Sequence, residues 1–207
     1  MMARTIAWSR VIGMIVREAP TRYNTLRMTM RLNARELRTT EVDPNVAKSI
    51  KKNPITIILD NVLDTYNIGS IFRLADAIAA EQVILCGETL TPPNSRIKKA
   101  SINTWGWVEW SYAKSAIDAI ALVKSQKSKV KIIAVEQDPR SKPCKDVQYD
   151  FPLAIVVGNE TTGVSREVLD MADMIVELPM WGINKSLNVM VSLGIVLYEV
   201  TKHLKNT

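Results

Sequence analysis

Histidine and cysteine are scarce in this chain, and their scarcity excludes several classes of active site. The single histidine, His203, lies near the C-terminus, which excludes a histidine-based catalytic triad and a zinc site. The two cysteines, Cys86 and Cys144, are too few for a disulfide framework and form no Cys-x-x-Cys pair. We therefore expect no metal site, and the cysteine content fits a reducing, cytoplasmic setting.

Long apolar runs and nucleotide-binding glycine motifs are also missing. The longest early apolar stretch, residues 6–16, is interrupted by Arg10 and is shorter than the roughly 20 residues of a membrane span. No two glycines have the Gly-x-Gly spacing of a dinucleotide-binding turn. Gly158 and Gly163 have the outer spacing of a P-loop, but Val164 occupies its lysine position. We therefore expect neither a membrane protein nor a nucleoside triphosphatase.

The positive charge is concentrated in the first quarter of the chain. Residues 1–52 hold 11 Lys and Arg against four Asp and Glu, whereas the remaining residues hold 16 against 17. A basic segment beside a near-neutral body suits a protein that binds a polyanion such as RNA, although a solubilising tail has the same composition. The first 40 residues contain eight arginines and no lysine, which also resembles a mitochondrial transit peptide. Residues 1–52 are predicted to be a basic N-terminal extension.

From residue 53 onward, short β-branched runs alternate with helical patterns. Strands are predicted over 55–59, 82–85, 131–135, 153–157 and 174–178, and helices over 68–79, 116–125, 165–172 and 187–204. This alternation predicts an α/β fold with a mostly parallel sheet and helices on both faces. The last predicted helix is apolar nearly all round, which favours a homodimer interface over packing within one domain.

The alternation fails between residues 90 and 112. Three cations, at positions 96, 98 and 99, are followed by tryptophans at 105, 107 and 110. Cations and aromatic rings together suit nucleic-acid binding. Aromatic residues at this spacing more often pack in a half-buried strand, so packing is the favoured interpretation of the tryptophans.

Three polar clusters each follow a predicted strand. They are residues 67–73 (Asn-Ile-Gly-Ser-Ile-Phe-Arg), residues 158–163 (Gly-Asn-Glu-Thr-Thr-Gly) and residues 178–188, which begin Leu-Pro-Met-Trp-Gly and end Ser-Leu-Asn. Functional groups collect beyond the carboxyl ends of parallel strands, so the clusters are predicted to converge on one site. Their Asn, Arg, Glu and Ser side chains suit methyl transfer from S-adenosylmethionine, whose sulfonium is already a good leaving group.

In order and spacing, the clusters resemble the motifs of the SpoU (TrmH) family of RNA ribose methyltransferases, in the SPOUT superfamily. The resemblance covers roughly residues 55–202 and includes Asn67-x-Gly69-x-x-x-Arg73 and Gly158-Asn-Glu160-x-x-Gly163. It implies a C-terminal deep trefoil knot, a homodimer through the knot region, S-adenosylmethionine as cofactor and transfer to a ribose 2′-hydroxyl of structured RNA. Residues 53–207 would form the methyltransferase domain.

The resemblance also implies roles for individual residues. Arg73 would clamp a phosphate and stabilise the developing alkoxide, because a guanidinium is a poor base. Asn67 would orient Arg73 or the ribose, or else cap its helix. Glu160 would help remove the proton or fix the site through hydrogen bonds. Ser186 and Asn188 would supply hydrogen bonds in the knot, or else cap the last helix.

The residues expected to contact cofactor and RNA form two sets. Those for the cofactor are Glu136, Val157, Gly158, Asn159, Leu178, Met180, Ser186, Leu187 and Asn188. Those for RNA are Arg73 and five arginines of the basic extension, Arg22, Arg27, Arg31, Arg35 and Arg38.

Several alternatives remain open at the level of the sequence. A non-catalytic RNA-binding module on the same fold would not need all five catalytic candidates, and a base methyltransferase is disfavoured by the third motif. The N-terminal segment contains no obvious separate RNA-binding domain, so tRNA is favoured over ribosomal RNA as substrate. A cytoplasmic location is expected, with a mitochondrial one as the alternative.

Overall fold

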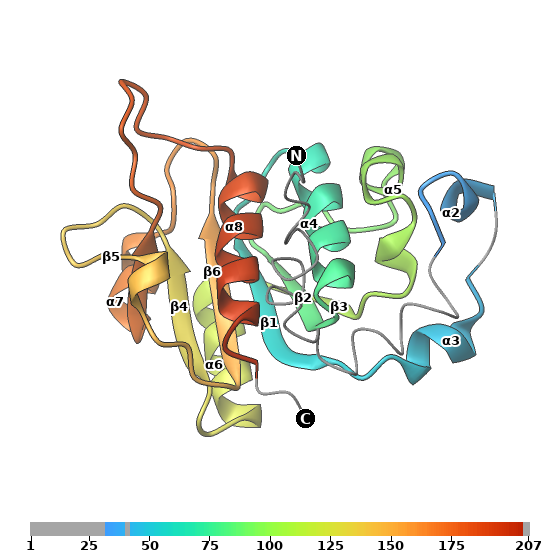
Figure 1. Ribbon diagram of the computed structural model, residues 1–207, viewed down its shortest axis with the longest axis horizontal. Helices are drawn as coiled ribbons and strands as arrows, with labels where there is room; N and C mark the ends of the chain where they lie inside the picture. The colour runs from blue at the N-terminus through green and yellow to red at the C-terminus, as the bar shows by residue number, and fades with distance from the viewer. Residues whose placement is uncertain (1–31, 40–41, 205–207) are drawn as a thin grey trace, which may run out of the picture. The chain divides into compact units, whose positions relative to one another are not determined.

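The computed structural model describes residues 32–39 and 42–204, and Ala34–Leu204 forms one compact unit (Figure 1). Within these residues, seven strands pair in one sheet in the order β3-β2-β1-β6-β4-β7-β5. They are β1 (Asn53–Asp60), β2 (Ala80–Cys86), β3 (Trp110–Ala113), β4 (Lys131–Val135), β5 (Lys142–Pro143), β6 (Leu153–Gly158) and β7 (Met174–Glu177). Every pairing is parallel, which confirms the predicted α/β class.

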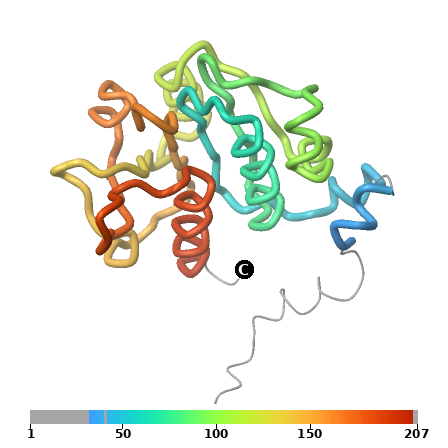
Figure 2. The backbone as a smooth tube through the Cα atoms, turned by 90° about the horizontal axis from the view of Figure 1, so that it is seen from above, coloured from blue at the N-terminus to red at the C-terminus, as the bar shows by residue number. Residues whose placement is uncertain are grey.

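Helices cover both faces of the sheet (Figure 2). One face carries α4 (Thr65–Ala77), α5 (Ser95–Ser101) and α8 (Val189–Thr201), and the other carries α6 (Ala116–Gln126) and α7 (Arg166–Met171). Four short elements complete the unit: α2 (Glu36–Thr39), α3 (Pro44–Ser49) and the 3-10 turns η2 (Thr104–Gly106) and η3 (Cys144–Asp146).

The central strands are buried on both sides, which explains their continuous apolar runs. In β1, Ile57 and Leu59 pack under α4 and α8, while Ile58 between them packs under α6 and α7. All three side chains are fully buried. The sequence pattern therefore located β1, β4 and β6 well, because a strand covered by helices on both faces is apolar at nearly every buried position.

Side-chain caps decide where the helices begin. Asp64 caps α4 by accepting a hydrogen bond from the Tyr66 N–H at 2.7 Å, so the helix starts at Thr65 rather than at residue 68. Asn67 lies inside the first turn, and its alternative role as the helix cap is wrong. Asn188 does cap α8, which starts at Val189 rather than at residue 187.

The segment without a clear pattern, residues 90–112, contains regular structure that the sequence did not predict. It forms α5, η2 and the edge strand β3. Only Ile97 and Ser101 are buried in α5, and β3 has four residues, so neither element is long enough to show a period.

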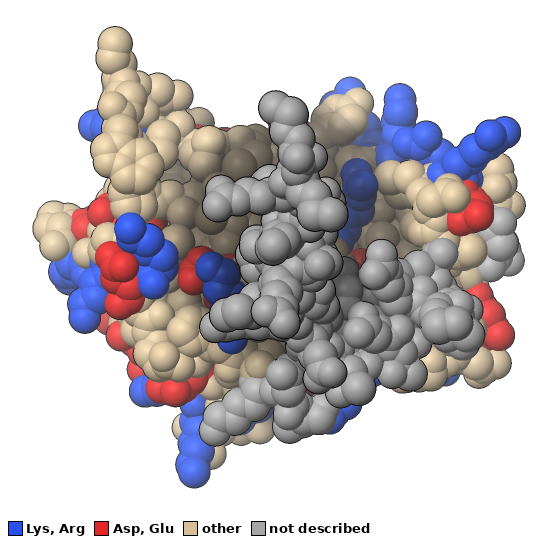
Figure 3. Space-filling model, viewed as in Figure 1, with Lys and Arg blue, Asp and Glu red and all other residues tan. Residues whose placement is uncertain are grey.

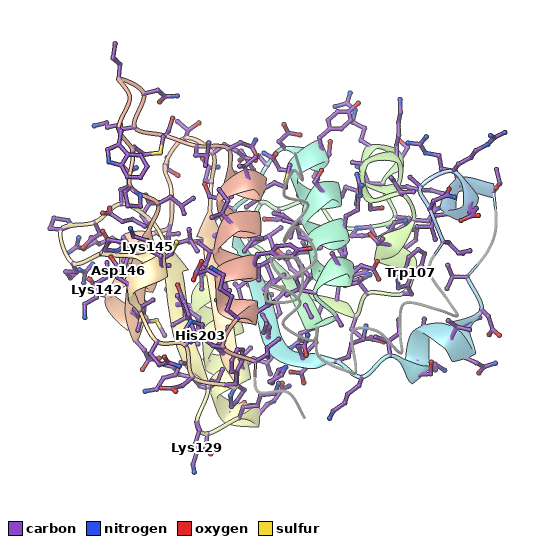
Figure 4. The ribbon with its side chains drawn as sticks, viewed as in Figure 1. Trp107, Lys129, Lys142, Lys145, Asp146 and His203 are labelled. Atoms are coloured by element: carbon purple, nitrogen blue, oxygen red, sulfur yellow. The ribbon has the colours of Figure 1, made fainter. Side chains whose placement is uncertain are left out.

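Two further findings concern single features of the described residues. No helix there has the length and apolar character needed to cross a lipid bilayer. His203 follows α8, and its ring packs edge-on against Tyr149 with 5.3 Å between ring centroids (Figure 4). This contact gives His203 a packing role within the unit.

Candidate functional site

A buried carboxylate ties the ends of β1 and β6 together. Asp60, which is 3% exposed, pairs in register with Gly158 across the two strands. Its Oδ2 accepts hydrogen bonds from the Ser165 N–H at 2.9 Å and from the Ser165 hydroxyl at 2.6 Å. Its Oδ1 accepts a third from the Asn61 side chain at 2.9 Å. This carboxylate anchors the segment that follows β6 to the end of β1.

Asp60 and Asn61 were not among the site residues predicted from the sequence. The sequence signal that could have identified them is an Asp-Asn pair directly after an apolar strand and shortly before the first polar cluster. Asn61 has a positive φ of 56°, a conformation that asparagine tolerates better than most residues. Its side-chain oxygen accepts a hydrogen bond from the Glu88 N–H at 3.0 Å, which joins the loop after β2 to the same edge of the sheet.

The second polar cluster forms a tight turn after β6. Asn159 and Gly163 exchange two backbone hydrogen bonds, at 3.0 and 2.9 Å. The Asn159 side chain donates to the Asn61 carbonyl at 2.9 Å, and its oxygen accepts from the N–H groups of Thr161 and Thr162. A Cβ atom on Gly158 would lie 2.1 Å from the Gly163 carbonyl carbon. Only glycine fits at position 158.

Glu136, directly after β4, supports this turn from the other side. Its Oε2 accepts a hydrogen bond from the Val164 N–H at 3.0 Å, and its Oε1 accepts one from the Gln137 N–H at 2.8 Å. Gly163 has a φ of +72°, and a Cβ there would lie 2.2 Å from the Glu136 carboxylate. Glu136 therefore holds the turn that carries Glu160.

One chain of hydrogen bonds joins the three polar clusters. The Asn67 side-chain N–H donates to Glu160 Oε1 at 2.9 Å, and the Asn188 side-chain N–H donates to Asn67 Oδ1 at 3.0 Å. These partners lie 93 and 121 residues apart in the sequence. The oxygen of Asn188 also accepts from the N–H groups of Met190 and Val191, so this side chain both caps α8 and links it to α4.

Glu160 is held as a carboxylate by its hydrogen bonds. Besides Asn67, the backbone N–H groups of Leu63 and Asp64 donate to it, each at 3.1 Å. Desolvation works to raise the pKa of Glu160, but the hydrogen bonds from the Asn67 side chain and from the backbone N–H groups of Leu63, Glu160 and Asp64 outweigh it and lower the pKa. A carboxylate with a lowered pKa is a weak proton acceptor, so the geometry favours the fixing role of Glu160 over proton removal.

Other candidates lie apart from this hydrogen-bond chain. Arg73 is exposed on α4, six residues and about 9 Å along the helix axis from Asn67. Ser186 is exposed, and its hydroxyl bonds only to the Asn184 side chain, at 3.0 Å. Leu187 is exposed and Val157 is buried inside β6.

The third cluster is an extended loop that leaves the body of the unit before α8 (Figure 1). Leu178 and Met180 are half-buried at its base, whereas Trp181 is 90% exposed. Gln137 Nε2 donates to the Lys185 carbonyl at 2.6 Å and so ties the loop to the segment after β4. Within the part of the chain that the structure describes, the backbone groups of residues 180–183 have no hydrogen-bond partner.

Only part of the basic N-terminal extension, which is predicted to bind RNA, lies within the described residues. Arg22, Arg27 and Arg31 fall outside the described residues. Arg35 directly precedes α2 and Arg38 lies within it, and both are exposed.

The role of Glu160 can be tested by its pH dependence. Because its pKa is lowered on folding, its ionisation stabilises the protein above the ordinary pKa of 4.5, and this contribution is lost as the pH falls through the folded value. Glu160→Gln keeps the size but leaves a backbone N–H without an acceptor, so we expect a loss of about 1 kcal/mol at pH 7 and a shallower fall in stability below pH 4.5. Urea unfolding from pH 3 to 7 measures both, with Glu167→Gln on α7 as control. An unchanged acid limb would contradict this role.

Comparison with known proteins agrees with the arrangement of the three clusters. The profile of the SpoU rRNA Methylase family matches residues 54–198. This chain belongs to that family. A tRNA (guanosine(18)-2′-O)-methyltransferase of Escherichia coli K12 is 29% identical over 155 residues, covering 73% of this chain and 65% of the relative. One of Aquifex aeolicus is 30% identical over 156 residues, covering 73% and 71%.

Solved structures of the family have the same fold. A crystal structure of an AdoMet-bound rRNA methyltransferase from Sinorhizobium meliloti superposes with a TM-score of 0.68 at 28% identity, covering 81% of this chain and 60% of that one. A TrmH/SpoU tRNA modifying enzyme of A. aeolicus has a TM-score of 0.67 at 26% identity, with 82% and 81% covered. The chain thus spans less than two thirds of the length of several relatives that it matches, including the E. coli enzyme.

Proposed function

We propose that this protein transfers a methyl group from S-adenosylmethionine to a ribose 2′-hydroxyl of structured RNA, with tRNA as the favoured substrate. The observation that carries the proposal is the hydrogen-bond chain Glu160–Asn67–Asn188, which joins three motifs of a methyltransferase family at one edge of the sheet. The E. coli and A. aeolicus relatives are named as tRNA ribose methyltransferases, which supports tRNA. The S. meliloti structure is named as an rRNA enzyme, so ribosomal RNA is the alternative.

The residues of the third cluster suit S-adenosylmethionine. Leu178 and Met180 offer half-buried apolar surface, and next to them in the chain the backbone groups of residues 180–183 bond to no residue that the structure describes. Such a surface can take an aromatic base and hydrogen-bond its polar edge. Ser186, Leu187 and Asn188 follow in the chain and lead into α8. We expect Gly158 and Asn159, where β6 ends, to contribute to the same cofactor site. When bound, the cofactor supplies a methyl group on a sulfonium that is ready to leave.

The protein side chains then have positioning and electrostatic roles. The hydrogen bonds among Asn67, Glu160 and Asn188 hold the N-terminal ends of α4 and α8 together. This arrangement would position the ribose relative to the methyl group. Arg73 contributes a fixed positive charge on the exposed side of α4, which stabilises the negative charge that develops on the 2′-oxygen.

We also infer the C-terminal trefoil knot that the family resemblance implies. The last strand, β7, lies between β4 and β5 rather than at the edge of the sheet. The chain after it is tied by Lys185 to the segment following β4, and then packs α8 against α4. A final segment inserted in this way between earlier parts of the chain is what a knot requires.

A homodimer through α8 fits the exposed face of that helix. Val191, Ile195 and Tyr198 are 38%, 46% and 57% exposed and border a shallow apolar groove that also includes Gly194. Burying these side chains against a second copy would remove apolar surface from water. A cytoplasmic location, with a mitochondrial one as the alternative, stays a prediction.

Transfer of a labelled methyl group tests the proposed reaction. The full chain is incubated with labelled S-adenosylmethionine and either bulk tRNA or ribosomal RNA, and the product is digested to nucleosides. We expect label in ribose-methylated nucleosides from tRNA. Label in ribosomal RNA alone would select the alternative substrate. Label on a base, or no transfer by protein that binds the cofactor, would count against the proposal.

A further inference from the structure

The exposed side of α5 carries a concentrated positive charge. Arg96, Lys98 and Lys99, here called the α5 basic patch, are all exposed, and α5 contains no acidic residue. None of the three forms an ion pair with any residue that the structure describes. Figure 3 shows Lys and Arg side chains gathered over α5 and α2.

Only part of this charge stabilises the helix that carries it, because Lys98 and Lys99 lie in its last turn, where the helix dipole favours positive charge. Arg96 lies in the first turn, where the helix dipole disfavours positive charge. Arg96 and Lys99 are three residues apart, so they are neighbours on the helix surface and repel each other. The helix dipole therefore does not account for Arg96, and three exposed cations close together suit an anionic ligand.

The patch is held rigidly beside the helix that carries Arg73. A Cβ on Gly69 of α4 would lie 2.6 Å from the Ala100 Cβ and 2.8 Å from the Ile97 carbonyl oxygen, so α5 packs against α4 at closest approach. α4 and α5 lie side by side in both ribbon and tube views (Figures 1 and 2). The motif glycine therefore sets the distance between α5 and the site helix.

Arg73 lies on the same side of α4 as this contact. It follows Gly69 by four residues, the spacing that places two residues on one helix face. Three residues further along, Asp76 accepts a hydrogen bond from the Trp107 indole N–H at 2.7 Å, just beyond η2 (Figure 4). Contacts with the 95–107 segment thus lie on both sides of Arg73 along α4. A ribose at Arg73 would have its neighbouring phosphates next to α5.

The basic surface continues onto α2. The side chain of Asn103 donates to the Leu37 carbonyl at 2.9 Å and so fixes α2 to the end of α5. This contact places α2, which carries the exposed Arg38, beside the end of α5.

We propose that the α5 basic patch binds the phosphate backbone of the substrate RNA next to the nucleotide presented to Arg73. The proposal rests on the proposed function for the identity of the polyanion. Lysine and arginine bind phosphates without reading the base, so the patch sets the position of the RNA strand rather than its sequence preference. The tryptophans of this segment pack against the core instead, as favoured from the sequence.

Matched charge removals test the patch. In the full chain, Arg96, Lys98 and Lys99 are replaced together by alanine, a good helix former. The control replaces three exposed lysines outside α5, namely Lys124, Lys129 and Lys145. Figure 4 labels Lys129 and Lys145, which lie away from α5. Binding of bulk tRNA is measured between 50 and 200 mM salt. Circular dichroism and thermal unfolding confirm that both variants fold.

We expect the patch variant to bind tRNA about tenfold or more weakly at low salt, with a salt slope smaller by about 2, because each lost phosphate contact removes roughly 0.7–0.9 from the slope. The control should change affinity by less than about twofold. In methyl transfer, the patch variant should raise KM for RNA and leave S-adenosylmethionine affinity unchanged.

Other outcomes separate this inference from the proposed reaction. Equal losses in both variants, or normal tRNA binding by the patch variant, would overturn the role of α5 even if methyl transfer occurs. Binding of polyglutamate is measured in the same way. If the patch variant bound polyglutamate more weakly but tRNA normally, the patch would bind an acidic protein, and this result would also overturn the proposed role in RNA binding. Weakened tRNA binding by the patch variant, with no transfer by wild type, would support the RNA surface while the proposed reaction fails.

Discussion

Replacing Arg73 by alanine is expected to lower the kcat/KM for RNA methylation by about 10²–10³-fold, which corresponds to about 2.7–4 kcal/mol of transition-state stabilisation. The guanidinium is exposed on α4, and its charge would act on the developing 2′-alkoxide rather than on the fold. The loss should therefore fall mainly on kcat. S-Adenosylmethionine affinity and the thermal unfolding midpoint should stay at their wild-type values, which calorimetry measures.

Two further variants define the role of Arg73. Arg73→Lys keeps a positive charge but loses the planar fork of donors, so its activity should lie between those of wild type and Arg73→Ala. Lys129→Ala, at a distant exposed position, should retain wild-type kcat. A fall in cofactor affinity or stability equal to the fall in rate would show that Arg73 maintains structure and does not act on the reacting oxygen.

Replacing Gly158 by alanine is expected to destabilise the protein by about 3 kcal/mol or more. The added methyl group would lie 2.1–2.2 Å from backbone atoms of Gly163 and Val164, which cannot rotate away as a side chain could. The turn would have to open, which breaks the paired hydrogen bonds between Asn159 and Gly163. Denaturant unfolding measures the change in stability.

Gly106→Ala is the matched control, because no heavy atom lies within 4 Å of a Cβ at that position. Its stability should change by less than about 0.5 kcal/mol, as for most surface substitutions. Since the Gly158 turn also carries Glu160, any folded Gly158→Ala protein should bind S-adenosylmethionine more weakly. Wild-type stability of Gly158→Ala would show that the turn opens without cost.

The accuracy with which the sequence predicted each helix or strand depended on the length and burial of that element. The prediction for β4, residues 131–135, agrees with the structure to the residue, because its apolar residues 132–134 are all buried between helices on both faces. α5 and β3 were missed because each is short and half-exposed, so few of their residues carry a burial pattern. The start of α4 was displaced by three residues because Asp64, and not Asn67, is its cap.

At the site, the sequence indicated the local motifs but not which of their residues form hydrogen bonds with one another. Asn67, Glu160 and Asn188 stand out in the sequence by type and spacing. That Asn67 is the central member, donating to Glu160 and accepting from Asn188, became visible only when α4, the β6 turn and α8 were packed together. The same holds for Asp60, whose importance comes from its bonds to Ser165, 105 residues away.

The sequence by itself determined the alternation of strands and helices, the three polar clusters and the membership of a methyltransferase family. These features depend on local periodicity and on residue types close together in the chain. The tertiary structure decided that Glu160 is a hydrogen-bonded support with a lowered pKa, and that Gly69 brings a basic helix against α4. Both depend on contacts between distant segments, and only the packing of the sheet and its helices brings such segments within hydrogen-bond or van der Waals distance.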